Sequence, residues 1–333
     1  MTNDTARIAR GFRRGLVAVA LVMGIARVEG QRSPAPGSTV GEAVPKPRSP
    51  FGIVTFDLKG PVPKVLARLG TGVVRGSCNW ADLEPARGAF NWSCSDDVIV
   101  GAQTLRLRSY MTVGCTPAWA NNGAGCRGMP ADIADWYGFV ANFVSRYTHF
   151  DTILGVWNEP NLTLDDTVSG ANYALLFINA SNARNTVNAN FPLAGPETSH
   201  HAAANGYYRQ TMGLIESYGA LDTQDIVAVH WYPDGPALTD YLDAIHDTAG
   251  SHEVWLSETG YATADLKAQA DFYGWLLQTF VRSDRAWWTH VIFYRLWDGL
   301  DCCTEAIVTS DFTPKPAFDT YRDWIEKPFA RPR

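Results

Sequence analysis

The sequence predicts an α/β protein with the (β/α)8 (TIM) barrel fold, and three observations lead to this prediction. Short segments rich in β-branched and apolar residues recur eight times after residue 50, and stretches with helical spacing separate them. The mean step between successive segments is about 34 residues, which suits a strand, a helix and two loops. Eight such units over about 280 residues fit a closed barrel.

The predicted strands cover residues 51–56, 73–77, 109–113, 153–157, 193–196, 226–230, 253–257 and 290–296. They lack clean alternation of apolar and polar residues, as expected where both faces of a parallel sheet are buried. Helical spacing predicts helices over 61–69, 132–147, 171–189, 206–217, 238–249 and 266–283, and a last helix from Lys315 onward. The rival is an open doubly wound sheet, but residues 56–61 (FDLKGP) lack its glycine-rich phosphate loop. We therefore expect no cofactor.

The first thirty residues have the layout of a secretory signal peptide. Four arginines at positions 7, 10, 13 and 14 precede an apolar run over 15–26, and small residues follow at 28–30. This run is too short to span a bilayer, and the alternative is an uncleaved leader or anchor. Residues 31–50 are rich in Pro, Gly and Ser and predict a flexible linker. We expect a single catalytic domain over 51–333, secreted or periplasmic, with no membrane contact after signal removal.

The net charge of −6 and the lack of a basic stripe argue against a nucleic-acid partner, and we expect a monomer. Six cysteines fit an oxidising compartment. Cys78 with Cys94 and Cys115 with Cys126 flank short loops, so these two disulfides are predicted, while the partners of the adjacent cysteines 302 and 303 stay open. A zinc site is the alternative, but no Cys-x-x-Cys or clustered Cys/His spacing supports it. No metal is expected.

Polar and aromatic residues gather after the predicted strands, where barrel enzymes place their chemistry. Two carboxylates stand out among them. Glu159 and Glu258 are 99 positions apart, close to three strand–helix units, which places them on strands four and seven. A retaining glycosidase needs two carboxyl groups only about 5–5.5 Å apart, one as nucleophile and one as acid. Arg75 and Tyr232 are candidate donors to an ionised nucleophile, and the acid is expected to hold its proton near neutral pH.

Four motifs resemble clan A of the glycoside hydrolases, particularly families 39 and 5. They are residues 155–161 (GVWNEPN), 254–260 (VWLSETG), 80–92 (WADLEPARGAFNW) and 230–232 (HWY). The resemblance implies that Glu159 is the acid/base, Asn158 binds the sugar 2-hydroxyl and Glu258 is the nucleophile. It also implies that the Tyr232 hydroxyl contacts this nucleophile. Family 39 enzymes usually carry a further β-domain, for which this length leaves no room, so the expectation is the clan.

Several single residues keep a structural alternative. Arg75 is either a site residue or a member of an ion pair in the barrel core, and His230 either belongs to the site or fills the core. Glu197 is ambiguous, and Glu84 is expected to fix its own loop. His200 and His201 follow strand five and are candidates to reach the cleft, without a metal.

Tryptophans that follow strands offer flat apolar faces on which sugar rings stack. Trp80, Trp119, Trp231 and Trp297 hold such positions, although ordinary packing is the alternative. The sequence therefore predicts hydrolysis of a β-glycosidic bond with net retention, on a carbohydrate substrate. A transglycosylase with the same two glutamates and a carbohydrate-binding barrel without activity are the two rivals.

Overall fold

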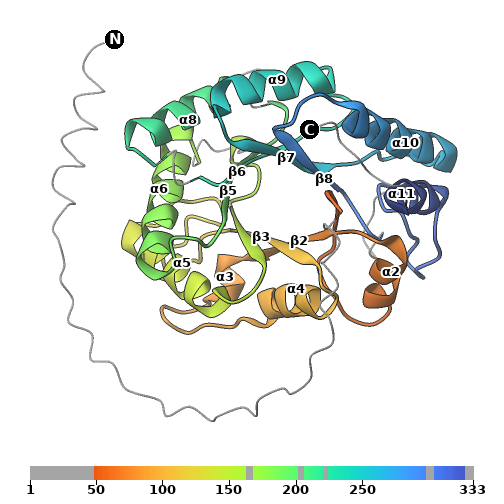
Figure 1. Cartoon of the computed structure of the whole chain (residues 1–333). Coiled ribbons are helices and arrows are strands. Elements are labelled where there is room, and N and C mark those ends of the chain that lie inside the picture. Colours follow the sequence, from red (N-terminus) through yellow and green to blue (C-terminus); the bar gives the residue numbers. More distant parts are fainter. Residues whose placement is uncertain (1–48, 163–167, 202–205, 221–223, 298–303, 327–333) are drawn as a thin grey trace, which may run out of the picture. The chain divides into compact units, whose positions relative to one another are not determined.

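The computed structural model describes residues 49–162, 168–201, 206–220, 224–297 and 304–326. Within them, eight parallel strands pair in chain order, and β1 also pairs with β8, so that the sheet closes. Helices surround this ring (Figure 1). The predicted (β/α)8 barrel is confirmed. The predicted signal peptide, nearly all of the predicted linker and both Cys302 and Cys303 lie outside the described residues.

All eight observed strands overlap the predicted segments. They are β1 (Phe51–Val54), β2 (Val73–Asn79), β3 (Arg108–Gly114), β4 (Thr152–Val156), β5 (Leu193–Thr198), β6 (Ile226–His230), β7 (Glu253–Thr259) and β8 (Trp288–Phe293). The prediction extends β1 two residues and β8 three residues too far. Because β8 ends at Phe293, the first residue after this strand is Tyr294.

The barrel helices are α2 (Val62–Leu69), α4 (Ser93–Thr104), α5 (Ile133–Tyr147), α6 (Gly170–Val187), α8 (Tyr207–Ser217), α9 (Leu238–Ala249), α10 (Leu266–Arg282) and α11 (Pro316–Glu326). The short α3 (Trp80–Leu83) and the 3-10 helix η1 (Pro160–Leu162) follow β2 and β4. The sequence did not predict α4, because its sequence SCSDDVIVGAQT carries only a weak apolar stripe. Among the described helices, none is both long and apolar enough to cross a membrane.

One part of the core fills the interior of the barrel. Its members are Val54, Val73, Tyr110, Ile153, Ala194, Ile226, Ala228, Trp255 and Ile292. The ring of Trp255 stacks on His290, with the ring centroids 3.6 Å apart, and lies 6.0 Å from the ring of Tyr110. These large side chains fill the interior of the barrel beneath the ends of the strands.

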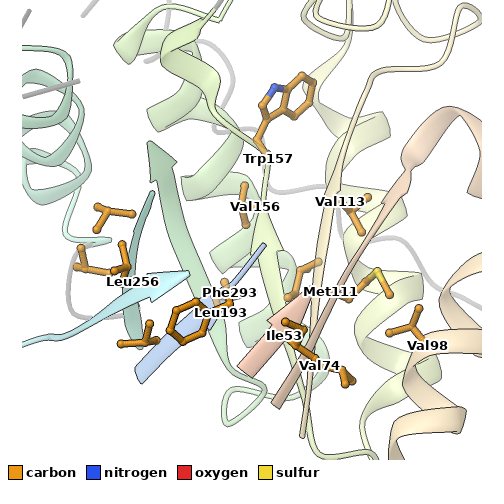
Figure 2. Close-up of a cluster of buried hydrophobic side chains, with 14 of the residues drawn as sticks. Ile53, Val74, Val98, Met111, Val113, Val156, Trp157, Leu193, Leu256 and Phe293 are labelled. Carbon is orange, nitrogen blue, oxygen red and sulfur yellow. The ribbon is translucent and has the colours of Figure 1, made fainter. Parts of the chain in front are cut away.

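The larger part of the core lies between the strands and the helices. Figure 2 shows side chains from several strands in this layer together with Val98 of α4. Helix α5 illustrates how the sequence builds it: the Asp132 side chain caps the helix by accepting from Ala134 N. Its buried residues then recur at helical spacing: Trp136, Phe139, Val140, Phe143, Val144 and Tyr147. The two layers together hold the strand ends, and hence the site, in fixed positions.

Candidate active site

A cavity of about 390 Å³ opens at the carboxyl ends of the strands. We call it the central cavity. Its described lining consists of Phe56, Arg75, Ser77, Asn79, Gly114, Cys115, Cys126, Arg127, Trp157, Asn158, Glu159, Glu258 and Tyr294. The two glutamates singled out by the sequence therefore face the same space, from β4 and β7.

Arg75 connects the polar groups of the site. Its side chain is 3% exposed, and its Nη1 donates to Glu258 Oε2 at 2.7 Å. Its Nη2 donates to Asn158 Oδ1 at 2.8 Å and also bonds Glu197 Oε2. The sequence left open whether Arg75 serves the site or a core ion pair, and the structure shows both arrangements at once. Since the guanidinium orients the Asn158 amide by its oxygen, the amide nitrogen is left to donate elsewhere.

Glu197 is a third carboxylate, fully buried beneath the two glutamates of the cavity. Tyr110 donates to its Oε1 at 2.9 Å, and Thr112 donates to both carboxylate oxygens at 3.0 Å. Burial alone raises the pKa of Glu197, but the charges of Arg75 and His230 outweigh it and lower the pKa. The group is therefore ionised, and it balances the charge of Arg75.

Gly155 makes room for this buried carboxylate. It lies in β4, and a Cβ there would collide with Glu197 Oε1 and with the ring of Tyr110. Any larger residue would displace the carboxylate or the ring, so the glycine of the GVWNEPN motif serves the packing of Glu197.

Glu258 receives donors on both of its oxygens. Arg75 binds Oε2, and the Tyr232 hydroxyl donates to Oε1 at 2.7 Å. Burial and the charge of Glu258 raise the pKa of Tyr232 well above its ordinary value, so the hydroxyl stays protonated as a donor. The Glu258 side chain is 12% exposed and faces the central cavity. These contacts hold a carboxylate in one orientation, as a nucleophile requires.

Glu159 is set by an unusual backbone at the end of β4. Trp157 and Glu159 have φ angles of 66° and 42°, which non-glycine residues adopt rarely and at a cost of about 1–3 kcal/mol each. Two backbone bonds hold this turn, from Trp157 N to Val113 O and from Glu159 N to Glu197 O, both at 2.9 Å. The turn directs the Glu159 side chain toward β6, where His230 Nδ1 lies 3.0 Å from Glu159 Oε1.

The surroundings of this pair favour a protonated His230 beside an ionised Glu159. Burial lowers its pKa, but the charge of Glu258 and the contacts with Glu159 and Glu197 outweigh it and raise the pKa to about 9. Burial correspondingly raises the pKa of Glu159, and the hydrogen bond and charge of His230 reverse this and lower it. The sequence predicts that Glu159 holds its proton near neutral pH, whereas the lowered pKa of Glu159 and the raised pKa of His230 favour the proton on His230.

The two cavity carboxylates approach each other closely. One oxygen of Glu159, one of Glu258 and a ring nitrogen of His230 all lie within 4.8 Å of one another. Such a trio has the spacing of a metal site, but His230 Nδ1 is already engaged with Glu159, and Arg75 and Tyr232 occupy Glu258. The geometry suits two carboxyl groups that act on one atom between them.

Two predicted stacking residues lie elsewhere. Trp80 is fully buried, and its Nε1 donates to Glu84 Oε2 at 2.7 Å. Trp119 donates to Glu84 O at 2.7 Å, and the Arg87 guanidinium covers its ring at 4.9 Å. Neither belongs to the described lining of the central cavity. Both pack the loop after β2, which Glu84 fixes as expected. Because Trp80 is fully buried, its predicted contact with substrate is wrong, whereas substrate contact by the half-buried Trp119 stays a prediction.

Trp231 and Trp297 also make packing contacts, and substrate contact by the half-buried Trp297 stays a prediction. Trp231 is 5% exposed and stacks beside Phe272. Trp297 stacks on Phe312 with the ring centroids 5.4 Å apart and is absent from the described cavity lining. The aromatic residue that enters the cavity after β8 is Tyr294, whose ring lies edge-on to that of Phe56. The predicted strand extends to residue 296 and therefore includes Tyr294, whereas β8 ends at Phe293 and Tyr294 follows it.

Arg127 is a cavity residue that the sequence reasoning missed. It follows Cys126, and its guanidinium lies 3.4 Å from Glu159 O. The predicted disulfides Cys78–Cys94 and Cys115–Cys126 are both present. The Cys115–Cys126 disulfide lines the cavity and links the loop that carries Arg127 to the end of β3. Because Cys115 directly follows β3, the predicted pairing already indicated that this loop lies beside the site.

Comparison with known proteins supports the class of the site. Residues 129–291 match the family model described as the glycosyl hydrolase catalytic core. No curated protein matches the sequence significantly. The matched region contains β4, β6 and β7, and with them Glu159, His230 and Glu258.

Solved structures share the fold at low sequence identity. A family 39 glycoside hydrolase from the gut symbiont Bacteroides cellulosilyticus superposes with a TM-score of 0.68 at 19% identity, over 84% of this chain and 64% of that chain. The family 39 enzyme from Xanthomonas axonopodis pv. citri gives 0.63 at 15%, over 82% and 65%. A family 10 endo-β-1,4-xylanase from Gloeophyllum trabeum gives 0.64 at 17%, over 84% and 96%. This chain therefore spans slightly less than two thirds of the two family 39 structures.

Residues 129–291 thus match a glycosyl hydrolase catalytic core, and the solved structures that share the (β/α)8 barrel of this chain include glycoside hydrolases of families 39 and 10. The resemblance drawn from the four sequence motifs is confirmed at this level.

Proposed function

We propose that the protein hydrolyses a β-glycosidic bond of an oligo- or polysaccharide with net retention at the anomeric carbon. The approach of the Glu159 and Glu258 carboxylates to within 4.8 Å carries the proposal, because retaining enzymes hold these groups about 5–5.5 Å apart, whereas inverting enzymes leave room for water. The two groups also have different partners, which fits different tasks.

In the first step, Glu258 attacks the anomeric carbon and forms an ester, while the bond to the leaving oxygen breaks and this oxygen takes a proton from Glu159. Arg75 and Tyr232 hold Glu258 for the attack. In the second step, Glu159 takes a proton from water, which attacks the same carbon and releases Glu258.

The proton that Glu159 delivers is stored in its pair with His230. The imidazolium is fully buried and 3.0 Å from the carboxylate, so a transfer within the pair readies Glu159 as the acid without any exchange with solvent. Asn158, held by Arg75 through its oxygen, is left with its amide nitrogen to donate to the sugar hydroxyl next to the reacting carbon.

The substrate then lies against the central cavity, with Phe56 and Tyr294 as its aromatic walls. Phe56 is 44% exposed and lines the central cavity, so its ring is available for a sugar to stack on. We further propose that the protein is exported, since both described disulfides are typical of proteins from oxidising compartments.

Azide rescue of two variants tests the roles of the glutamates. With an activated aryl β-glycoside and azide, Glu258→Gly should yield the inverted glycosyl azide, because azide replaces the nucleophile in the first step. Glu159→Ala should instead yield the retained azide, because azide then attacks the ester on Glu258. Near-full activity of Glu258→Gly without azide would refute the nucleophile role, and the same azide from both variants would refute the division of roles.

A further inference from the structure

A second cavity of about 430 Å³ lies beside the central cavity, and we call it the side cavity. The loops after β5, β6 and β7 form most of its described wall, with His200, Tyr232 and Tyr261 among the lining residues. It shares one described residue with the central cavity, and that residue is Glu159. Glu258 therefore borders the central cavity alone, whereas Glu159 stands between the two spaces.

This arrangement gives the bound substrate a direction. The sugar that becomes attached to the enzyme must lie over Glu258 and Asn158, in the central cavity. The leaving oxygen must lie at Glu159, which gives it a proton. The part of the substrate beyond that oxygen then continues past Glu159, and the space on that side is the side cavity.

The side cavity contains buried polar atoms that need partners. His200 is 6% exposed, and neither of its ring nitrogens has a hydrogen-bond partner in the described part of the chain. Glu305 Oε2, on the wall contributed after β8, is buried and equally without a partner there. Buried polar atoms are nearly always hydrogen-bonded, so atoms of this kind on two walls of one cavity point to a ligand with several hydroxyl groups.

His200 is held in place by its neighbours rather than by its own nitrogens. Asn161 Nδ2 donates to Ser199 Oγ at 2.8 Å, and Ser199 N donates to Asn161 Oδ1 at 3.0 Å, which fixes the loop after β5 to η1 beside Glu159. A Cβ at Gly235 would lie 3.0 Å from His200 Cγ, so the ring packs closely against that glycine. The nearest carboxylate oxygen, Asp234 Oδ1, is 3.8 Å from His200 Nε2.

This position keeps the imidazole neutral. Burial, followed by the charge of His201, lowers the pKa of His200 below its ordinary value. A neutral imidazole presents one donor and one acceptor, which matches a pair of sugar hydroxyls. A third cavity of about 410 Å³ shares His200, His201 and Asp234 with the side cavity, so that the space continues away from Glu159.

On the basis of the proposed glycosidase activity, we propose that the side cavity binds the leaving group, that this group is itself a sugar chain, and that His200 hydrogen-bonds its hydroxyls. The substrate is then an oligo- or polysaccharide with at least one sugar on the leaving side of the cleaved bond. A glycoside with a small aryl leaving group would gain nothing from this cavity.

Two substrates with the same reacting sugar separate this role from a structural one. The dinitrophenyl β-glycoside that the parent enzyme cleaves fastest identifies the sugar, and a β-linked tetrasaccharide of that sugar is the second substrate. His200→Phe keeps a flat ring but offers no hydrogen bond. We expect its kcat/KM to fall at least about tenfold on the tetrasaccharide and less than about twofold on the aryl glycoside. His200→Gln, which retains a donor and an acceptor, should recover part of the loss.

Two further variants complete the experiment. Glu305→Ala tests the opposite wall and should show the same selective loss. His149→Ala changes an exposed histidine in the loop that enters β4, at the end of the barrel opposite the site, and it should leave both values unchanged. An equal fall on both substrates, or no fall, would overturn the role of His200. A parent enzyme that cleaves aryl glycosides but not the tetrasaccharide would overturn the sugar leaving group, while the retaining cleavage of a β-glycosidic bond by Glu159 and Glu258 would still stand. A parent enzyme that cleaves neither would refute the activity itself.

Discussion

Arg75 and Glu197 form an ion pair closed off from solvent, with side chains 3% and 0% exposed, directly beneath the two cavity glutamates. Removing a charge from water is costly, and such a pair persists because both partners find further hydrogen bonds. Arg75 also binds Glu258 and Asn158, while Glu197 also binds Tyr110 and Thr112. The pair therefore connects the interior of the barrel to the orientation of the reacting groups.

Glu197→Ala should lower the free energy of unfolding by about 3–5 kcal/mol, because it leaves the Arg75 charge buried without its counter-ion. Urea denaturation measures this change. The matched control is Asp271→Asn, which removes the partner of Lys267 in an exposed ion pair on α10, and it should produce no measurable change. Equal stability of the Glu197→Ala variant and the parent would contradict the charge balance described here.

Tyr232→Phe should lower kcat/KM on an aryl glycoside by about 10- to 100-fold, because it removes the 2.7 Å donor to the proposed nucleophile while keeping the ring. Steady-state kinetics measure the loss, and circular dichroism checks the fold. Tyr137→Phe removes a hydroxyl that bonds Thr186 on the outside of the barrel, and it should leave kcat/KM unchanged. Equal kinetics for the two variants would contradict the role of Tyr232.

Removing either disulfide should lower the free energy of unfolding, but only one of the two removals should change KM. Each closes a short loop, of 11 and 16 residues in sequence separation, and each should contribute about 3 kcal/mol to the free energy of unfolding. Cys115→Ser with Cys126→Ser should also raise KM severalfold, because this bridge lines the central cavity. Cys78→Ser with Cys94→Ser should leave KM unchanged, since neither cysteine belongs to the described cavity lining. Parallel changes of KM in both pairs would contradict this distinction.

The sequence predicted those site residues whose position depends on a strand end and on a local motif. Asn158, Glu159, His230 and Glu258 lie at or next to the ends of their strands, and the barrel brings such positions together whatever the remaining sequence. Glu197 also follows this rule, but its role depends on contacts from other strands.

The less accurate predictions concern residues whose surroundings come from distant parts of the sequence. The space for Glu197 comes from a glycine in β4, its counter-charge comes from β2, and no local pattern records either. Trp80 was wrongly placed in the site because a side chain after a strand has two apolar environments available, the cavity and the covering loops. Trp80 and Trp119 found hydrogen bonds to Glu84 in the loop instead. Composition alone does not distinguish these environments.

The stability of the protein should decrease as the pH rises through the alkaline range, because of His230. Its pKa is raised to about 9 in the folded state from an ordinary value of 6.5. A raised histidine pKa stabilises the folded state fully below pH 6.5, and this contribution is lost as the pH approaches and passes about 9. Denaturation of the parent and of His230→Gln across this range measures the difference. The difference should shrink with rising pH, and a difference independent of pH would contradict a buried imidazolium.

The fall of kcat/KM at alkaline pH should depend on the same proton, the one shared by His230 and Glu159. In the parent, kcat/KM should fall as the pH rises through about 9, because the Glu159–His230 pair then has no proton to give to the leaving oxygen. In His230→Gln, Glu159 must hold the proton alone, without the imidazolium as its store. The fall should therefore move to lower pH by more than about one unit, since a carboxyl group releases its proton well below pH 9. His149→Gln, with the same substitution at an exposed position, should keep the parent profile. An unshifted fall in His230→Gln would mean that Glu159 draws its proton from solvent, and the buried imidazolium would then serve only to orient it.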